Sequence, residues 1–165
     1  NRSLKMAVQV GDSIPDVTLK IMGENGPEDI STADVFSGKK VVMFAVPGAF
    51  TPTCSARHLP GFVEQADQIF EKGVDAIACL SVNDAWVMDA WGKDQNVGDK
   101  IIMLADGNGT LTRALGLELD RTDSGLGIRS SRYAMVVNDG VVTHLNQEAV
   151  GKLEVSDAKT MLSAL

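Results

Sequence analysis

The sequence predicts an α/β fold in which a central mixed β-sheet is flanked by helices. Two observations support this prediction. Apolar runs of strand length alternate with segments of helical periodicity, and an Asp-Gly pair joins two β-rich runs late in the chain. A strand, a helix and a second strand in succession imply parallel pairing, with helices on both faces of the sheet. With 165 residues, the chain is expected to form one domain over residues 1–165.

The first strand is predicted at residues 41–46, a continuous apolar run that suits a strand buried on both faces. A loop rich in proline and glycine follows over residues 47–54. The next helix extends to about Lys72, and Gly73 provides its stop. Within it, Pro60-Gly61 is expected to bend the helix or to delay its regular part.

Strand and helix signals continue to alternate after this helix. Strands are predicted at residues 74–82 and 101–104, and helices at residues 85–94 and 111–115. Either Asn83 or Asp84 can cap the longer of these two helices.

The final part of the chain is predicted to form a hairpin and a helix. Residues 133–137 and 141–145 are rich in β-forming side chains and flank Asp139-Gly140, a strong signal for a β-hairpin. Ser156-Asp157 then opens a last helix that runs to the end of the chain.

Composition argues against several classes of function. The 15 basic and 22 acidic residues give a net charge of −7 with no basic stripe, so we expect no nucleic-acid partner. No apolar run approaches the roughly 20 residues that span a bilayer, so we expect no membrane association. Two cysteines cannot form a secreted disulfide framework, which favours a reducing compartment, and a structural zinc site is also disfavoured.

The N-terminal stretch, residues 1–5, is too short and too polar for a signal peptide. The sequence does not start with methionine, which leaves a removed targeting segment open. We therefore expect the cytoplasm, with a mitochondrion or plastid as the alternative.

Cys54 follows the buried strand and its loop and stands at the start of a helix. Ligands bind beyond the ends of central strands in open α/β sheets, and the free N–H groups of a first helical turn stabilise a thiolate, the nucleophilic form of cysteine. Thr51 lies close enough for its hydroxyl to meet the sulfur or an oxygen beside it, while Pro47 and Pro52 stiffen the loop. Taken alone, an ordinary buried cysteine is an equal alternative.

The segment Pro47-Gly48-Ala49-Phe50-Thr51-Pro52-Thr53-Cys54 resembles the Pro-x-x-x-Thr-x-x-Cys active-site motif of the peroxiredoxins. Its surroundings are similar to the type II, or atypical two-cysteine, class of that family. Matches to this class run from near residues 10–12 to the C-terminus and include residues 46–62, 78–85, 91–92 and 132–137. The resemblance implies a thioredoxin-like fold and a thiol-dependent peroxidase.

The resemblance also implies roles for four residues. Cys54 is the peroxidatic cysteine that attacks the peroxide, Thr51 hydrogen-bonds the peroxide and the sulfur, and Pro47 shields the site. Arg132 completes the site from a later strand, where it would stabilise both the thiolate and the negative charge on the departing oxygen. No metal, haem or flavin is implied.

Three other polar residues compete for a role. Arg129 lies three positions before Arg132, so in an extended strand the two face opposite ways, and we expect Arg129 in a surface ion pair. His58 shares a helix face with Cys54, which could suggest a thiol hydrolase, but no third residue orients it and we expect a local structural or supporting role. His144 is expected to be an ordinary strand residue.

Cys79 is the only internal thiol that could reduce the oxidised Cys54. Its spacing resembles the resolving cysteine of plant-type members, yet residues 76–80 read as a buried strand, so an inert core cysteine is the alternative. The vertebrate-like members carry a resolving cysteine near the C-terminus, and residues 153–157 here contain none. We therefore expect a one-cysteine-like cycle completed by glutathione with glutaredoxin, or by thioredoxin.

The function expected from these residues is reduction of hydrogen peroxide and alkyl hydroperoxides in antioxidant defence. A homodimer is implied by the resemblance, and an exposed Phe50 would be consistent with it.

A dithiol oxidoreductase is disfavoured because it needs a Cys-x-x-Cys motif, whereas Ser55, Ala56 and Arg57 follow Cys54 here. A glutathione peroxidase-like enzyme is the nearer rival, and a non-catalytic redox sensor or interaction module is the alternative from another class.

Overall fold

The structure, a computed structural model, describes residues 7–165. The first six residues of the expected domain, with the stretch considered above as a signal peptide, lie outside the described residues.

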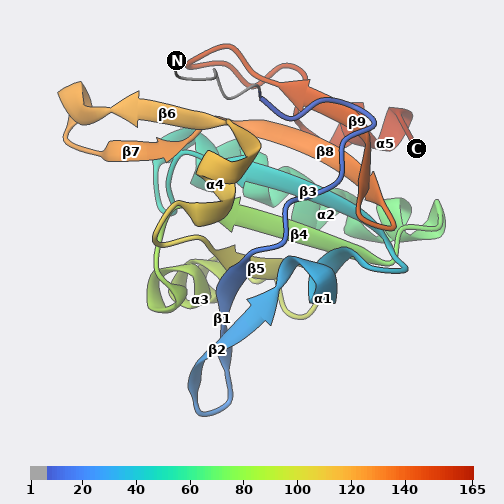
Figure 1. The fold of residues 1–165 in the computed structure, drawn as a ribbon, viewed down its shortest axis with the longest axis horizontal. Coiled ribbons are helices and arrows are strands. Elements are labelled where there is room, and N and C mark those ends of the chain that lie inside the picture. Colours follow the sequence, from blue (N-terminus) through green and yellow to red (C-terminus); the bar gives the residue numbers. More distant parts are fainter. Residues whose placement is uncertain (1–6) are drawn as a thin grey trace, which may run out of the picture.

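A seven-stranded mixed sheet in the order β2-β1-β5-β4-β3-β8-β9 forms the centre of the molecule (Figure 1). Strands β3 (Lys40–Val46), β4 (Ala76–Ser81) and β5 (Ile102–Ala105) run parallel, as the alternation of strands and helices predicted. Strand β8 (Tyr133–Asn138) pairs antiparallel with β3 and forms the predicted hairpin with β9 (Val141–Gln147).

Strand β3 is buried on both faces because its side chains alternate between two separate hydrophobic clusters. Val42, Phe44 and Val46 point into one cluster, and the residues between them point into the other. This pattern explains why the sequence shows a continuous apolar run here rather than an alternation of apolar and polar residues.

Helices cover both faces of the sheet, and α4 lies in front of it in Figure 1 while α2 lies behind. The cluster on one face contains residues of α2 (Leu59–Glu71), α3 (Ala85–Asp94) and α5 (Ala158–Ser163). The cluster on the other face contains residues of α1 (Thr32–Phe36) and α4 (Thr110–Leu115). Of the two possible caps for α3, Asp84 is the cap, because its carboxylate accepts the N–H of Val87 at 2.8 Å.

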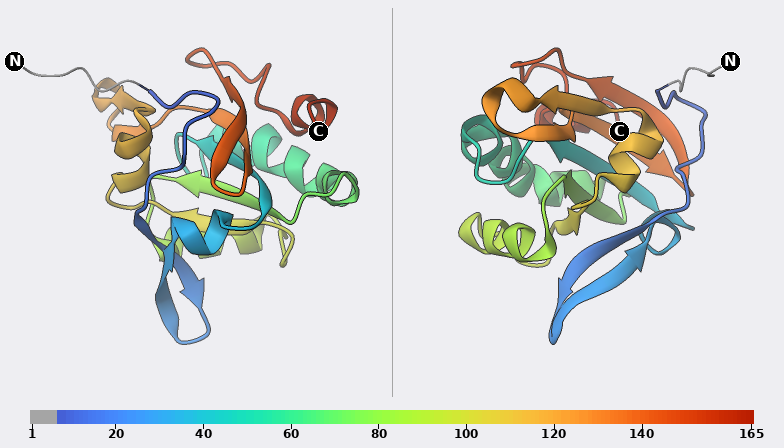
Figure 2. Two further views of the ribbon diagram at one scale, coloured as in Figure 1. Left: turned by 45° about the vertical axis from the view of Figure 1, so that its right-hand side comes forward. Right: turned by 60° about the vertical axis from the view of Figure 1, so that its left-hand side comes forward.

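Two pairs of strands were not predicted. The N-terminal hairpin of β1 (Thr18–Gly23) and β2 (Gly26–Ser31) extends the sheet at one edge and projects from the molecule (Figure 2). Strands β6 (Glu118–Arg121) and β7 (Gly127–Ser130) form a separate two-stranded sheet around the 3₁₀ turn η2 (Thr122–Ser124). Strands β2 and β6 are largely polar and exposed, so neither carries the apolar pattern of a strand. Strand β1 does alternate, with Leu19 buried, and was nevertheless missed in the prediction from the sequence.

The helix that follows the loop after β3 has an irregular first part. A π-helical turn, η1 (Cys54–His58), runs directly into the regular α2, and Pro60 lies in the first turn of α2. The regular part of the helix is therefore delayed, as expected from Pro60-Gly61. Lys72 caps the C-terminal end, and Gly73 has a positive φ of 89°, as expected for the predicted stop. Within residues 7–165, no helix is long and apolar enough to cross a membrane.

Candidate active site

Cys54 is the first residue of η1 and is completely buried. It belongs to the hydrophobic cluster beneath α2 and α3, next to the end of β3. The sequence therefore placed the sulfur correctly between a central strand and the start of a helix.

Arg132 provides the only side-chain hydrogen bond to this sulfur within the described part of the chain. Its Nη2 donates to Cys54 Sγ at 3.2 Å. Arg132 directly precedes β8, in which Ala134 and Val136 face the cluster that contains Cys54. Because alternate residues of an extended chain share a face, Arg132 is directed to the same side of the sheet.

His58 holds the other end of the Arg132 guanidinium. His58 is buried, its Nδ1 lies 2.9 Å from Nη1 of Arg132, and its Nε2 lies 2.9 Å from the carbonyl oxygen of Ser156. A guanidinium can only donate and a carbonyl can only accept, so Nδ1 must be unprotonated and Nε2 must carry the hydrogen. Burial lowers the pKa of His58 to about 4, which keeps this ring neutral at physiological pH.

Thr51, Pro47 and Arg132 line one cavity of about 380 Å³. The Thr51 hydroxyl donates to the carbonyl of Gly48 at 2.7 Å, so its hydrogen is used within the loop rather than on the sulfur. The oxygen of Thr51 consequently keeps its lone pairs as hydrogen-bond acceptors.

Two contacts from neighbouring elements hold the loop and the π-helical turn. Asn83, which follows β4, accepts the N–H of Ala49 at 3.0 Å, and the indole N–H of the buried Trp91 in α3 donates to Ser55 Oγ at 2.9 Å. Neither contact was predicted from the sequence, in which Asn83 was a possible helix cap and Trp91 belonged to a segment that matches the type II class.

The expected surface ion pair of Arg129 is wrong. Arg129 is half-buried, and its guanidinium donates to the carbonyls of Leu126, at 2.8 Å, and of Pro47, at 3.4 Å. As its position relative to Arg132 predicted, it does not reach the sulfur. It binds backbone carbonyls instead, and one of them belongs to the loop after β3.

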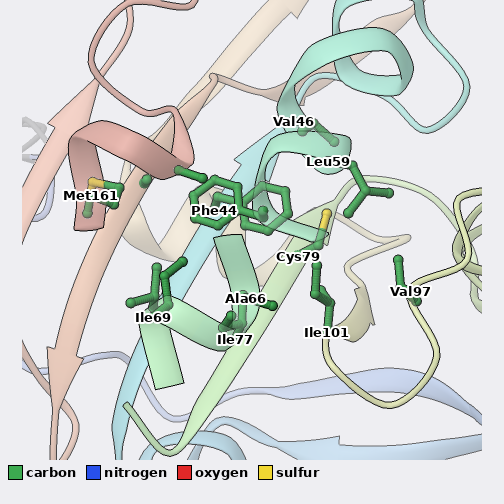
Figure 3. Packing of buried hydrophobic residues seen from close by; sticks show 14 of the residues in the cluster. Phe44, Val46, Leu59, Ala66, Ile69, Ile77, Cys79, Val97, Ile101 and Met161 are labelled. Carbon is green, nitrogen blue, oxygen red and sulfur yellow. The ribbon is translucent and has the colours of Figure 1, made fainter. Parts of the chain in front are cut away.

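Cys79 lies in β4 and is completely buried in the cluster shown in Figure 3. Both cysteines are free thiols in this structure. Burial raises the pKa of the Cys79 thiol well above its usual range, and the nearby Cys54 raises it further, against a smaller opposing effect of Arg132. In this conformation Cys79 is therefore a protonated core residue.

His144 lies in β9 with an exposed side chain, as expected for an ordinary strand residue. Among residues 7–165, no group of three or more His, Cys, Asp or Glu side chains is arranged to hold a metal ion.

Comparison with known proteins adds independent information. The model of the Redoxin family matches residues 9–162. Peroxiredoxin-2E, chloroplastic, of Arabidopsis thaliana is 51% identical over 164 residues, which cover 96% of this chain and 70% of the relative. Peroxiredoxin-2B of the same plant is 50% identical over 161 residues, covering 96% and 98%.

A solved structure agrees with these sequences. Reduced Prx3 from Vibrio vulnificus, described as a complex with H₂O₂, superposes with a TM-score of 0.91 at 53% identity. The match covers 95% of this chain and 98% of that chain. The chain thus belongs to the Redoxin family, as a peroxiredoxin of the type II class with a thioredoxin-like fold, and it is a thiol peroxidase.

Proposed function

We propose that Cys54 is the peroxidatic cysteine and that Arg132, Thr51 and Pro47 form the peroxide site around it. The single observation that carries this proposal is the 3.2 Å contact to the Cys54 sulfur from the guanidinium of Arg132, a residue that lines a cavity together with Thr51 and Pro47. A fixed positive charge at this distance favours the thiolate over the thiol.

The first step is a displacement at oxygen. The Cys54 thiolate attacks the terminal oxygen of a hydroperoxide, an S–O bond forms, and the O–O bond breaks. Cys54 becomes a sulfenic acid, and the departing alkoxide or hydroxide takes up a proton from water to give an alcohol or water. Negative charge grows on the departing oxygen, within reach of the Arg132 donors.

Thr51 is suited to orient the peroxide. Its hydrogen is committed to the Gly48 carbonyl, so its oxygen accepts the O–H of the bound hydroperoxide. Pro47, which has no N–H group, closes the site against bulk water. The substrates proposed from this arrangement are hydrogen peroxide and alkyl hydroperoxides.

The cycle is completed by an external thiol. One thiol attacks the sulfenic acid to give a mixed disulfide and water, and a second thiol releases the Cys54 thiol as a new disulfide forms. Glutathione with glutaredoxin, or thioredoxin, is the proposed reductant. The burial and protonation of Cys79 favour this one-cysteine-like cycle, because only a thiolate attacks.

A homodimer and a cytoplasmic location complete the proposal. Phe50 lies in the loop that precedes Cys54 and is 52% exposed, which is consistent with a partner chain at this face. Sedimentation of the wild type and of Phe50→Ser tests the dimer, which is excluded if both sediment as monomers.

One relative is named as chloroplastic, so the plastid is the alternative to the cytoplasm, and fractionation of the source cells distinguishes the two compartments.

Steady-state peroxide reduction by the wild type, Cys54→Ser and Cys79→Ser tests the chemistry, with glutathione/glutaredoxin and with thioredoxin as reductants. Cys54→Ser is expected to abolish turnover, and Cys79→Ser to keep glutaredoxin-supported turnover. Loss of that turnover in Cys79→Ser would contradict the one-cysteine-like cycle. Consumption of a single equivalent of peroxide by the wild type, with every reductant, would instead support a sensor.

A further inference from the structure

Glu148, which directly follows β9, is only 9% exposed and binds a segment of backbone that lies six to eight residues further along the chain. Its Oε2 accepts the N–H groups of Glu154, Val155 and Ser156 at 2.9, 2.8 and 2.7 Å, and the Ser156 hydroxyl at 2.7 Å. Its Oε1 accepts the Glu154 N–H at 3.0 Å. One carboxylate therefore fixes the backbone of residues 154–156.

This segment leads directly to the proposed active site. The carbonyl of Ser156 accepts the Nε2 hydrogen of His58, and Nδ1 of His58 accepts a hydrogen of Arg132. The other end of the same guanidinium meets the Cys54 sulfur. The hydrogen bonds thus form an unbroken path from the Glu148 carboxylate to the sulfur.

The main chain of Glu148 also binds Arg132. The Glu148 N–H donates to the Arg132 carbonyl at 2.9 Å. Glu148 consequently restrains Arg132 at both ends: the backbone directly, and the guanidinium through Ser156 and His58.

The carboxylate is charged at neutral pH. Although burial acts in the opposite direction, the hydrogen bonds from the Ser156 hydroxyl and from the backbone of residues 154–156 lower the pKa of Glu148 below its usual range. Hydrogen bonds to an ionised acceptor are the stronger kind, so residues 154–156 are held firmly.

We propose that Glu148 is a positioning residue for peroxide reduction, which fixes the Ser156 carbonyl so that His58 holds the Arg132 guanidinium against Cys54. This inference rests on the proposed roles of Arg132 and Cys54. Glu148 lines the same cavity as Arg132, but among the described residues its carboxylate makes no hydrogen bond to the sulfur or to the guanidinium, and it is connected to the guanidinium through Ser156 and His58.

Single-turnover oxidation by hydrogen peroxide tests the proposal, with the buried Trp91 beside η1 as the fluorescent reporter. Glu148→Ala is expected to lower the second-order rate constant by between about 10-fold and about 100-fold, the range expected from a small misplacement of a catalytic group. Glu148→Gln keeps one oxygen acceptor for the same N–H groups and is expected to recover most of the rate.

Asp106→Asn is the matched control. Asp106 is also a buried carboxylate, 2% exposed, that accepts two backbone N–H groups and a hydroxyl, in this case those of Leu111 and Thr112. Within residues 7–165, no hydrogen bond joins it to His58 or Arg132. Asp106→Asn is expected to lower the melting temperature without changing the rate of oxidation.

A double-mutant cycle separates positioning from general stability. In a His58→Leu background the path from Ser156 to Arg132 is already broken, so adding Glu148→Ala is expected to lower the rate by less than twofold more. Independent, multiplicative losses would overturn the proposal.

The ¹⁵N spectrum of the histidines provides a readout that does not depend on peroxide. The chain has two histidines, so one variant assigns both. The wild type is expected to show His58 fixed in the Nε2–H form, and Glu148→Ala is expected to show averaging between the two tautomers. A fixed Nε2–H form in Glu148→Ala would overturn the proposal.

The outcomes also separate this inference from the proposed function. If Arg132→Ala oxidises at the wild-type rate, the proposed site is wrong and the inference falls with it. If Arg132→Ala is slow but Glu148→Ala, folded by circular dichroism, is not, the site stands and the positioning role of Glu148 is wrong.

Discussion

Arg132 has only hydrogen-bond donors, so every group that contacts it must be able to accept. The Cys54 sulfur is one acceptor, and Nδ1 of His58 is the other, which accepts only while the imidazole is neutral. A protonated His58 would place a donor and a second positive charge against the guanidinium. The protonation state of His58 therefore affects the position of the Arg132 guanidinium next to the sulfur.

The stability of the protein is expected to depend on the neutrality of His58. Burial lowers the pKa of His58 to about 4 in the folded state, whereas an unfolded histidine titrates near 6.5. The unfolded state binds the proton more tightly, so the contribution of His58 is complete above about pH 6.5 and is lost as the pH falls towards about 4. The total is roughly 3 kcal/mol, of which about 2 kcal/mol is lost by pH 5.

Urea unfolding between pH 7 and pH 5 measures this effect. The wild type is expected to lose stability across this interval, and His58→Leu, which cannot titrate, is expected to lose clearly less. An NMR titration that places the pKa of His58 near 6.5 in the folded protein would contradict the explanation.

Some residues of the proposed site could be identified from the sequence and others could not, for a physical reason. The alternation of side chains in an extended chain indicated that only one of Arg129 and Arg132 could face the sulfur, and the resemblance to the peroxiredoxins implied Arg132. Glu148 could not be found, because its partners are backbone N–H groups whose positions depend on how residues 148–156 fold back. The sequence shows only a glutamate in a polar segment.

The loop between β3 and η1 is the element on which the site depends most closely. A Cβ atom added at Gly48 would lie 3.1 Å from Thr51 Cγ2 and 3.1 Å from Nη1 of Arg129. Both distances are shorter than ordinary contacts, so Thr51 or Arg129 would have to shift. The loop needs glycine at this position because two side chains from different elements pack against its backbone.

Gly48→Ala is expected to lower the rate of peroxide reduction by about tenfold, because a displaced Thr51 no longer orients the peroxide. Gly61→Ala is the control. A Cβ at Gly61 meets only Ala158 at 3.9 Å, and alanine is the better helix former by about 0.5–1 kcal/mol. Steady-state kinetics and thermal melting measure both variants, and a wild-type rate in Gly48→Ala would contradict this account of the loop.

Elements were predictable in proportion to how much apolar surface they bury. Strand β3 is almost entirely buried, and its apolar run identified it within one residue. Strand β2 has the sequence GPEDIS with no fully buried residue, and its formation depends on pairing with β1, including an ion pair between Lys20 and Asp29. A polar strand that forms by pairing with its neighbour leaves no periodic signal of its own in the sequence.

At the scale of the whole molecule, both cysteines lie in the same hydrophobic cluster, but the groups next to each of them differ. Cys54 is bound by a guanidinium at the end of β3, next to a cavity lined by Arg132 and Thr51. Cys79 lies within β4, between strands on both sides, with apolar neighbours. The fold therefore gives one sulfur a guanidinium partner and leaves the other among apolar side chains.

Trapping of the sulfenic acid tests this central claim most directly. The wild type is treated with one equivalent of hydrogen peroxide in the presence of dimedone, and the modified cysteine is located by mass spectrometry of peptides. The adduct is expected on Cys54 and absent from Cys79, and Arg132→Ala is expected to form it much more slowly. An adduct on Cys79, or equal labelling of both cysteines, would contradict the account.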